Sequence, residues 1–360
     1  MKYPFGGFFK GKKILITGHT GFKGAWLSIW LKMLGADLAG YALKPSTEPS
    51  LFDILGLSKM MQSKTGDVRN RSSLNAFLRE FRPEIIFHMA AQSLVRPSYL
   101  DPISTYETNV MGTVNLLDAC RALPSIKAIV NVTSDKCYEN HGGNAPYKEA
   151  DPMGGHDPYS SSKGCAELVS NAYRRSYFNQ DNYGKKHNIA LASVRAGNVI
   201  GGGDWSEDRL IPDVIRAYQN KQLLALRYPD AVRPWQYVLE PLYGYLMLAK
   251  RLYEDGPDFS GAWNFGPGKK NEKPVRWIVE NINKFLGGTL PWEADLTTQP
   301  HESEYLRLDS KKAGSLLGWH SRMDLTSALS ETVEWYKVWR EKQDMYKYSV
   351  NQINSYISRE

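Results

Sequence analysis

The sequence predicts an α/β fold in which helices cover both faces of a mainly parallel sheet, followed by a smaller C-terminal lobe. Three observations support this prediction. Short apolar runs alternate with helical patterns through the first half of the 360 residues. A glycine-rich turn follows the first apolar run. After about residue 201 the loops lengthen and Pro, Trp and Gly become common, which indicates a change of architecture.

The strands of the predicted sheet are almost continuously apolar. This is typical of parallel strands that are buried on both faces, whereas a half-exposed strand alternates between apolar and polar residues. Such runs occur at residues 14–16, 38–43, 84–90, 128–132 and 189–194. Helical patterns lie between them, at residues 22–34, 72–81, 110–123 and 160–178.

The predicted domain boundaries follow from this pattern. Residues 1–200 form the first domain, and residues 201–340 form the smaller lobe. The segment 233–250 is a candidate for a return to the first domain. Residues 341–360 are predicted as a polar tail.

Composition excludes several classes of protein. The chain is 42% hydrophobic and 23% charged, which is ordinary for a globular enzyme. No run approaches the roughly 18 apolar residues of a membrane helix, and the start lacks the apolar core of a secretory signal, so we expect a cytoplasmic protein. The net charge of +7 comes from scattered residues, which favours small anionic ligands over nucleic acid.

The three cysteines predict neither disulfides nor a metal site. Cys120, Cys137 and Cys165 are odd in number and include no Cys-x-x-Cys pair. We therefore expect three reduced thiols and no bound metal.

The glycine-rich turn predicts a dinucleotide site. Gly18, Gly21 and Gly24 follow a strand and open a helix, so the backbone can approach a pyrophosphate at the positive end of the helix dipole. This arrangement identifies the sheet as doubly wound and of the Rossmann type. The candidate cofactor-binding residues of the turn are Gly18, His19, Gly21, Phe22, Lys23 and Gly24.

The Gly-x-x-Gly-x-x-Gly spacing resembles that of the extended short-chain dehydrogenase/reductase family. Further family motifs follow in order, and the resemblance covers roughly residues 10 to 337. It implies that residues 66–69 meet the adenine and that residues 88–92 lie beside the pyrophosphate and ribose. The additional cofactor-binding residues that it implies are Asp67, Val68, Ala90, Ala91, Gln92 and Asn109.

One position departs from the family pattern. An acidic residue is expected about 20 residues after the glycines to hold the ribose hydroxyls, but residues 41–46 contain no carboxylate. Lys23 and Lys44 would also suit the additional phosphate of NADP. We predict NAD, because an enzyme that recycles its own cofactor does not need the reduced NADP pool.

Tyr159 and Lys163 form the predicted catalytic pair. At a spacing of four residues on a helix, the two side chains lie on one face, and a nearby ammonium group lowers the pKa of a phenol. Lys163 can also hydrogen-bond the nicotinamide ribose, so both residues are candidates for cofactor contact as well.

Ser134, Asp135 and Lys136 follow the strand at 128–132, where ligands bind in such sheets. Sugar-nucleotide dehydratases commonly have Thr-Asp-Glu here. The Ser-Asp-Lys sequence resembles the dehydratases that convert CDP-glucose into CDP-4-keto-6-deoxyglucose for deoxysugar synthesis. The resemblance implies that Ser134 binds the reacting hydroxyl, Asp135 is the acid for the departing C6 hydroxyl, and Lys136 stands in the position of the C5 base.

The second half of the chain contains the predicted substrate contacts. Residues 195–201 resemble the family segment that meets the sugar diphosphate, 209–212 the segment under the base, and 233–238 a segment whose Arg binds phosphate. His301, Glu302 and Tyr305 precede the family's closing helix. The candidate substrate-binding residues are Ser134, Asn198, Arg209, Leu210, Arg233 and Tyr305.

Two alternatives remain open at this point. One is another sugar-nucleotide enzyme, either a dehydratase for dTDP- or GDP-sugars or a UDP-sugar 4-epimerase. The other is a non-catalytic dinucleotide-binding regulator, which predicts the loss of Tyr159 or Lys163. The resemblance also implies self-association as a homodimer or homotetramer through the helices that follow the fourth and fifth strands.

Overall fold

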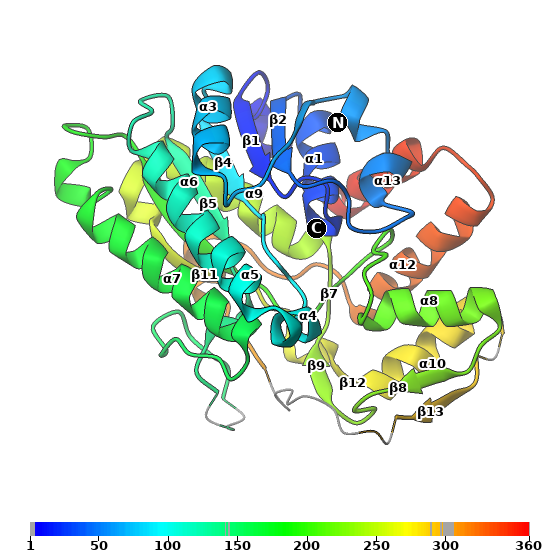
Figure 1. Cartoon of the computed structure of the whole chain (residues 1–360). Helices are drawn as coiled ribbons and strands as arrows, with labels where there is room; N and C mark the ends of the chain where they lie inside the picture. Colours follow the sequence, from blue (N-terminus) through cyan, green and yellow to red (C-terminus); the bar gives the residue numbers. More distant parts are fainter. Residues whose placement is uncertain are drawn as a thin grey trace.

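A computed structural model describes residues 4–140, 142, 145–288, 290–295, 297 and 306–359. Its centre is a seven-stranded parallel sheet of order β11-β6-β5-β4-β1-β2-β3 (Figure 1). The strand order reverses between β1 and β4, and such switch points bind ligands at the carboxyl ends of the strands. The strands are β1 (Lys13–Thr17), β2 (Asp37–Ala42), β3 (Gln62–Thr65), β4 (Ile85–His88), β5 (Ala128–Val132), β6 (Ala190–Arg195) and β11 (Gly261–Asn264).

Helices cover both faces of this sheet (Figure 1). Ile14 and Ile16 of β1 pack toward α1 (Phe22–Met33) and α9 (Leu239–Asp255), while Leu15 packs toward the opposite layer. Successive side chains of a strand point to opposite faces, so a strand between two helical layers is apolar throughout. The opposite layer contains α3 (Arg71–Phe81), α6 (Gly112–Cys120) and α7 (Pro158–Ser176).

The predicted doubly wound parallel fold is confirmed, and the predicted strands and helices of the first 200 residues are present. The strand β3 has no apolar signal, because all four of its residues are polar and exposed. Short helices that the periodicity did not reveal are α2 (Leu51–Ile54), α4 (Val95–Leu100) and α5 (Pro102–Tyr106). The helix expected at 110–123 begins with a π-helical turn at Glu107–Met111.

The smaller lobe lies below the sheet on the right of Figure 1. It contains α8 (Leu210–Asn220), α10 (Val275–Leu286) and two short sheets. The parallel pair is β8 (Leu224–Leu226) with β13 (Trp292–Ala294), and the antiparallel pair is β9 (Val232–Pro234) with β12 (Glu272–Pro274). A further pair, β7 (Val199–Ile200) with β10 (Gln236–Tyr237), carries the chain between the lobe and the large domain.

The division at residue 201 needs two corrections. Besides α9, strand β11 also returns to the large domain, where it pairs with β6, and α11 (Lys311–Leu317) packs against it. The predicted tail is instead the helix α13 (Met345–Ile357), which packs against α1 and α12 (Leu325–Arg340). Its largely polar sequence contains three buried apolar anchors, Met345, Ile353 and Tyr356, which are too few to dominate its composition.

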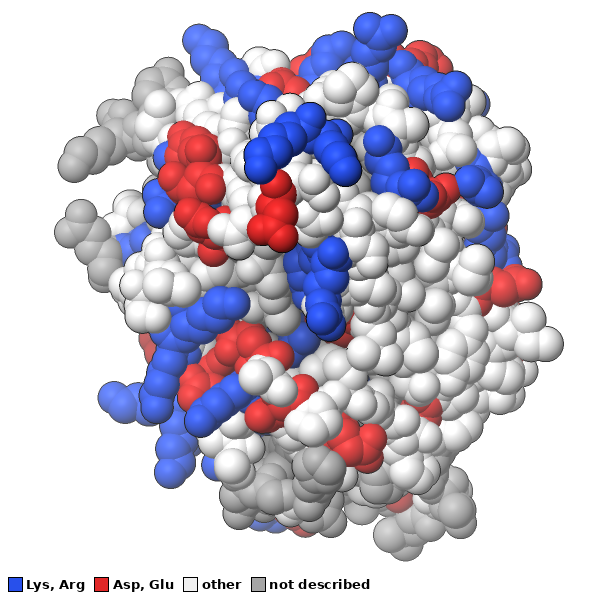
Figure 2. Space-filling model, turned by 90° about the vertical axis from the view of Figure 1, so that its left-hand side faces the viewer, with Lys and Arg blue, Asp and Glu red and all other residues white. Residues whose placement is uncertain are grey.

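The surface charge and the hydropathy of the helices agree with what the composition predicts. Figure 2 shows Lys and Arg interspersed with Asp and Glu across one face of the molecule. Among the helices of the described ranges, none combines the length and apolar character needed to cross a membrane. The same part of the chain contains no group of three or more His, Cys, Asp and Glu side chains arranged to hold a metal ion.

Candidate active site

Two adjoining cavities, each of about 300 Å³, open at the carboxyl ends of the central strands. The cofactor cavity lies against the glycine turn, and the catalytic cavity lies between the large domain and the smaller lobe. Lys23, Thr133, Tyr159 and Arg209 line both of them. A ligand in one cavity can therefore reach a ligand in the other at Tyr159.

The glycine turn is built for close backbone approach. Gly18 has φ +74°, and a Cβ there would lie 2.7 Å from the Ala90 nitrogen. A Cβ on Gly24 would lie 2.2 Å from the Gly18 oxygen. Gly21 caps α1 without any side-chain hydrogen bond, so the first amides of the helix face the cavity uncapped, which suits a pyrophosphate.

Most of the predicted cofactor residues line the cofactor cavity. Asp67 is oriented there by Arg69, whose hydrogen bonds hold the pKa of the Asp67 carboxyl below its usual range. Lys44 and Thr47 lie where an acidic residue was expected. The predicted residues that line this cavity are Gly18, Gly21, Phe22, Lys23, Gly24, Asp67, Val68, Ala90, Ala91, Tyr159 and Lys163.

Three predicted cofactor residues do not line it, and their side chains support the loops behind. His19 is fully buried, and its Nε2 lies 2.8 Å from the Ser63 hydroxyl. Asn109 donates to the Gln92 carbonyl and accepts from the Gln92 amide at 2.8 Å. The Gln92 side chain donates to the Leu94 carbonyl at 2.9 Å. These three residues were assigned to the cofactor because they are close in sequence to residues that line the cavity. Their hydrogen-bond partners are instead other residues of the protein.

Tyr159 and Lys163 lie in the first turns of α7, as predicted. Asp157 caps this helix by accepting from the Ser160 amide at 2.9 Å. The Lys163 amine donates to the Val132 carbonyl at 3.3 Å. Burial raises the pKa of Tyr159 to about 12, while a hydrogen bond with Ser134 opposes that change.

The expected lowering of the phenol pKa by Lys163 is therefore wrong for this geometry. Burial, and secondarily the charge of Lys23, lowers the pKa of Lys163 to about 7, so burial favours the uncharged forms of both groups.

The Ser134-Asp135-Lys136 segment begins at the end of β5. The Ser134 hydroxyl donates to Asp135 Oδ1 at 3.0 Å and accepts from the Lys136 amide at 3.2 Å. Asp135 is 4% exposed, and its Oδ2 has no hydrogen-bond partner in the described part of the chain. Burial raises the pKa of Asp135 against the opposing charges of Lys136 and Lys23. A buried carboxyl that favours its protonated form is suited to act as an acid.

A buried ion pair supports this segment from behind. Glu167 Oε1 accepts from the Thr133 hydroxyl at 2.5 Å, and its carboxylate pairs with Arg195 at 2.8 Å. Both side chains are 3% exposed. The sequence analysis assigned no role to Glu167, because its partners lie on β5 and β6 and only the folded sheet brings them together.

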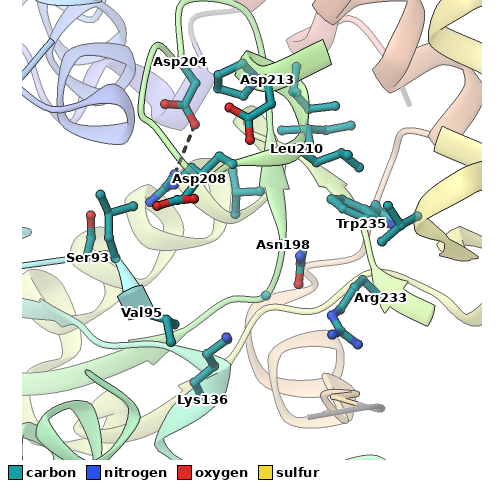
Figure 3. Close-up of a pocket in the computed structure, with 18 of the residues that line it drawn as sticks. Ser93, Val95, Lys136, Asn198, Asp204, Asp208, Leu210, Asp213, Arg233 and Trp235 are labelled. Carbon is teal, nitrogen blue, oxygen red and sulfur yellow. Dashed lines mark hydrogen bonds and ion pairs between the residues drawn. The ribbon is translucent and has the colours of Figure 1, made fainter. Parts of the chain in front are cut away.

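The remaining substrate candidates lie around the catalytic cavity (Figure 3). Lys136 points into it from one side, opposite Asn198 and Arg233. Arg209 pairs with Asp204 at 3.1 Å, and Leu210 begins α8 beside it. Tyr305 lies outside the described residues, as do His301 and Glu302.

The sequence analysis missed several residues of this cavity. Three of them are carboxylates. Trp235 lies within the predicted phosphate-binding segment 233–238, but the sequence analysis assigned it no role. Their loops and helix starts have no local signal for a ligand. The missed residues include Ser93, Asp204, Asp208, Asp213 and Trp235.

Comparison with known proteins identifies the family. The family model described as GDP-mannose 4,6 dehydratase matches residues 15–332. The chain belongs to this family. The resemblance to sugar-nucleotide dehydratases of the extended short-chain dehydrogenase/reductase type, which rested on motifs alone, is thereby confirmed.

Members of the family differ widely in their sequence identity with this chain. A CDP-glucose 4,6-dehydratase of Salmonella typhimurium is 53% identical over 351 residues, which cover 98% of each chain. The dTDP-glucose 4,6-dehydratase 1 of Escherichia coli is 26% identical and is matched over 90% of this chain and 92% of its own.

Solved structures agree with the fold. The dTDP-glucose 4,6-dehydratase of Bacillus anthracis in complex with NAD has a TM-score of 0.75 and 24% identity, covering 93% of this chain and 100% of its own.

Proposed function

We propose that this protein is a hydro-lyase that converts CDP-D-glucose into CDP-4-keto-6-deoxy-D-glucose and water, with NAD as a recycled cofactor. The observation that carries the proposal is the buried Asp135 at the end of β5, beside Ser134 and Lys136, with one carboxyl oxygen unpartnered in the described chain. The 53% identity with the Salmonella typhimurium CDP-glucose 4,6-dehydratase supports the nucleotide.

The cofactor cavity suits NAD. The uncapped start of α1 at Gly21 provides amide donors for a pyrophosphate, and Gly18 removes the side chain that would block the approach to Ala90. Asp67 and Val68 would lie at the adenosine end, and Tyr159 and Lys163 at the nicotinamide end. When bound, NAD accepts the hydride of the sugar C4 and later returns it to C6.

The side chains of this chain would move the protons. Tyr159, hydrogen-bonded with Ser134, would take the proton of the C4 hydroxyl in its ionised form, which burial disfavours and the positive charge of bound NAD would favour. The resulting C4 ketone acidifies the hydrogen on C5, and Lys136 takes that proton. Asp135 gives its proton to the C6 hydroxyl, which leaves as water. Lys136 then returns its proton to C5, and the proton taken by Tyr159 replaces the one that Asp135 gave, so the sugar has lost one water in total and each side chain regains its starting form.

Asp135 favours this reaction over the alternatives. A 4-epimerase has no leaving hydroxyl, so it needs no buried acid at this position. A non-catalytic regulator would not need the Tyr159–Lys163 pair, whose tyrosine lines both cavities and whose lysine lines the cofactor cavity. The dTDP-glucose dehydratases are much less similar, at 26% identity for the Escherichia coli enzyme.

We also propose that the protein works in the cytoplasm as a homodimer or homotetramer. An apolar face, defined here as the exposed side chains of α4, α5 and α7, supports self-association. Leu100 is 87% exposed, Ile103 72% and Leu168 58%. The three helices contact one another, and in Figure 1 they run from the left (α7) to the lower centre (α4).

The first experiment is incubation of the pure protein with NAD and, separately, CDP-, dTDP-, UDP- and GDP-hexoses. We expect a 4-keto-6-deoxy sugar, one water lighter by mass spectrometry, from CDP-glucose in preference to the others. A C4 epimer of unchanged mass would contradict the proposed role of Asp135. Cofactor binding without turnover of any sugar would favour the regulator.

A further inference from the structure

The end of the catalytic cavity farthest from the reacting groups contains a carboxylate. Figure 3 shows Lys136 at one end, Asp213 at the other, and Asn198 and Arg233 on the wall between them. If the sugar reacts at Asp135 and the phosphates lie against Arg233, as the proposed function requires, the nucleobase extends toward Asp213. This end is also lined by apolar residues, among them Ile211, Leu224, Leu226 and Val275, and by Asp208 and Arg227, whose charges act on Asp213.

Asp213 is held in one orientation. Its Oδ1 accepts a hydrogen bond from the Arg216 guanidinium. Arg216 is itself fixed, because it donates to the Trp205 carbonyl at 2.9 Å and the Ser206 carbonyl at 3.1 Å. Asp213 Oδ2 has no hydrogen bond to any described residue, and the side chain is 33% exposed. One oxygen is therefore occupied, and the other is available to a ligand.

The neighbouring carboxylates are engaged differently. Asp208 Oδ1 lies 3.3 Å from both the Arg96 and the Arg227 guanidinium. Asp204 accepts from Arg209 at 3.1 Å and from the Ser206 amide at 3.1 Å. Asp213 thus differs from these neighbours in having a single guanidinium partner at hydrogen-bond distance, Arg216, while its second oxygen has no hydrogen bond to the described residues.

We propose that Asp213 selects the nucleobase by accepting a hydrogen bond from the 4-amino group of cytosine. This inference rests on the proposed function. Uracil and thymine have a carbonyl oxygen at the same position, and that oxygen would face the carboxylate as a second acceptor. In a half-buried site this unmatched pair is costly, so Asp213 both attracts CDP-sugars and rejects UDP- and dTDP-sugars.

The substitution Asp213→Asn tests the proposal sharply. Arg216 can only donate hydrogen bonds, so it holds the amide oxygen of the new side chain and turns the amide NH₂ toward the base. That group donates to uracil O4 and faces the cytosine amino group as a second donor. We expect the ratio of kcat/KM for CDP-glucose over UDP-glucose to fall by roughly 10- to 100-fold, the range for a hydrogen bond to a charged group.

The matched control is Asp208→Asn, which removes a neighbouring charge from the same cavity. Because its Oδ1 is shared by Arg96 and Arg227, we expect any change to affect both nucleotides equally and to leave the ratio unchanged. Calorimetric titration with CDP and UDP measures the same preference without turnover, so an inactive variant still gives a result.

The outcomes separate this inference from the proposed function. An unchanged CDP:UDP ratio in folded Asp213→Asn would overturn the inference, as would a shift that appears in Asp208→Asn instead. If the unmodified protein dehydrates no CDP-glucose, the proposed function fails. The CDP:UDP binding ratio then still decides whether Asp213 reads the base.

Discussion

At the scale of single residues, the two cavities place two ionisable groups, Asp135 and Lys163, where burial favours their uncharged forms. Burial raises the pKa of Asp135 and lowers that of Lys163 to about 7. Both changes have the same cause, because a charged form loses more than a neutral form when water is removed. The raised pKa of Asp135 favours its protonated form, which is the form that a general acid needs, whereas an exposed aspartate is ionised more readily.

Replacing Asp135 with Asn tests the acid role. The amide keeps the size of the side chain and can still accept from Ser134, but it cannot give up a proton to the C6 hydroxyl. We expect water loss to slow by roughly 100- to 10,000-fold, the usual contribution of a general acid, while C4 oxidation continues. Quenching with borodeuteride should then reveal deuterium at C4 of a sugar that still has its C6 hydroxyl.

The control for this variant is Asp230→Asn, because Asp230 is 73% exposed and forms an ion pair with the exposed Arg276. Water loss at the unmodified rate in Asp135→Asn would remove Asp135 from the reaction.

At the scale of elements, one buried carboxyl attaches the C-terminal helix to the large domain. Glu240, at the start of α9, accepts from the Arg322 amide at 2.9 Å, the Met323 amide at 2.7 Å and the Tyr356 hydroxyl at 3.0 Å. It is 0% exposed, and burial raises its pKa to about 7. Helix α13 is thus joined to α9 through a group that titrates near neutral pH.

This arrangement predicts a pH-dependent stability. The folded protein holds a proton on Glu240 between its ordinary pKa of 4.5 and about 7, whereas the unfolded chain does not. The stabilisation that protonated Glu240 gives to the folded state is therefore complete below pH 4.5 and is lost as the pH rises through 7. It amounts to no more than about 3.5 kcal/mol, since one pKa unit corresponds to about 1.4 kcal/mol.

The variant Glu240→Gln removes this titration and keeps the hydrogen bonds, since the amide oxygen accepts from the two backbone amides and the NH₂ donates to Tyr356. We expect the free energy of unfolding, from urea titrations at about pH 4.5 and about pH 8.5, to fall less with pH than in the unmodified protein. An equal fall in both proteins would show that Glu240 is ionised throughout.

At the scale of the whole molecule, the catalytic cavity exists only where the chain's two regions meet. Asp135 and Tyr159 come from the large domain, and Arg209, Asp213 and Arg233 come from beyond residue 200. The apolar face of α4, α5 and α7 is made by side chains that do not line this cavity, namely Leu100, Ile103 and Leu168.

A double variant, Leu100→Glu with Leu168→Glu, tests whether that face mediates self-association. Two charges on a contact surface oppose its burial, because each must lose water without gaining a partner. We expect light scattering after gel filtration to show smaller particles for the variant than for the unmodified protein. The control is Leu316→Glu on α11, where the side chain is 55% exposed. A variant of unchanged particle mass would place the interface elsewhere.

Much of this protein is determined by local sequence. Apolar runs predict the buried parallel strands, and the glycines at 18, 21 and 24 predict the dinucleotide turn. The spacing of Tyr159 and Lys163 predicts that they share a helix face. These three features depend only on periodicity or backbone freedom over a few residues.

Tertiary structure alone decided the rest. It returned β11 to the main sheet, turned His19 away from the cofactor cavity, raised the pKa of Tyr159 and placed Asp213 at the far end of the catalytic cavity. Each of these outcomes depends on burial and on partners distant in the chain, and no local pattern of residues encodes them.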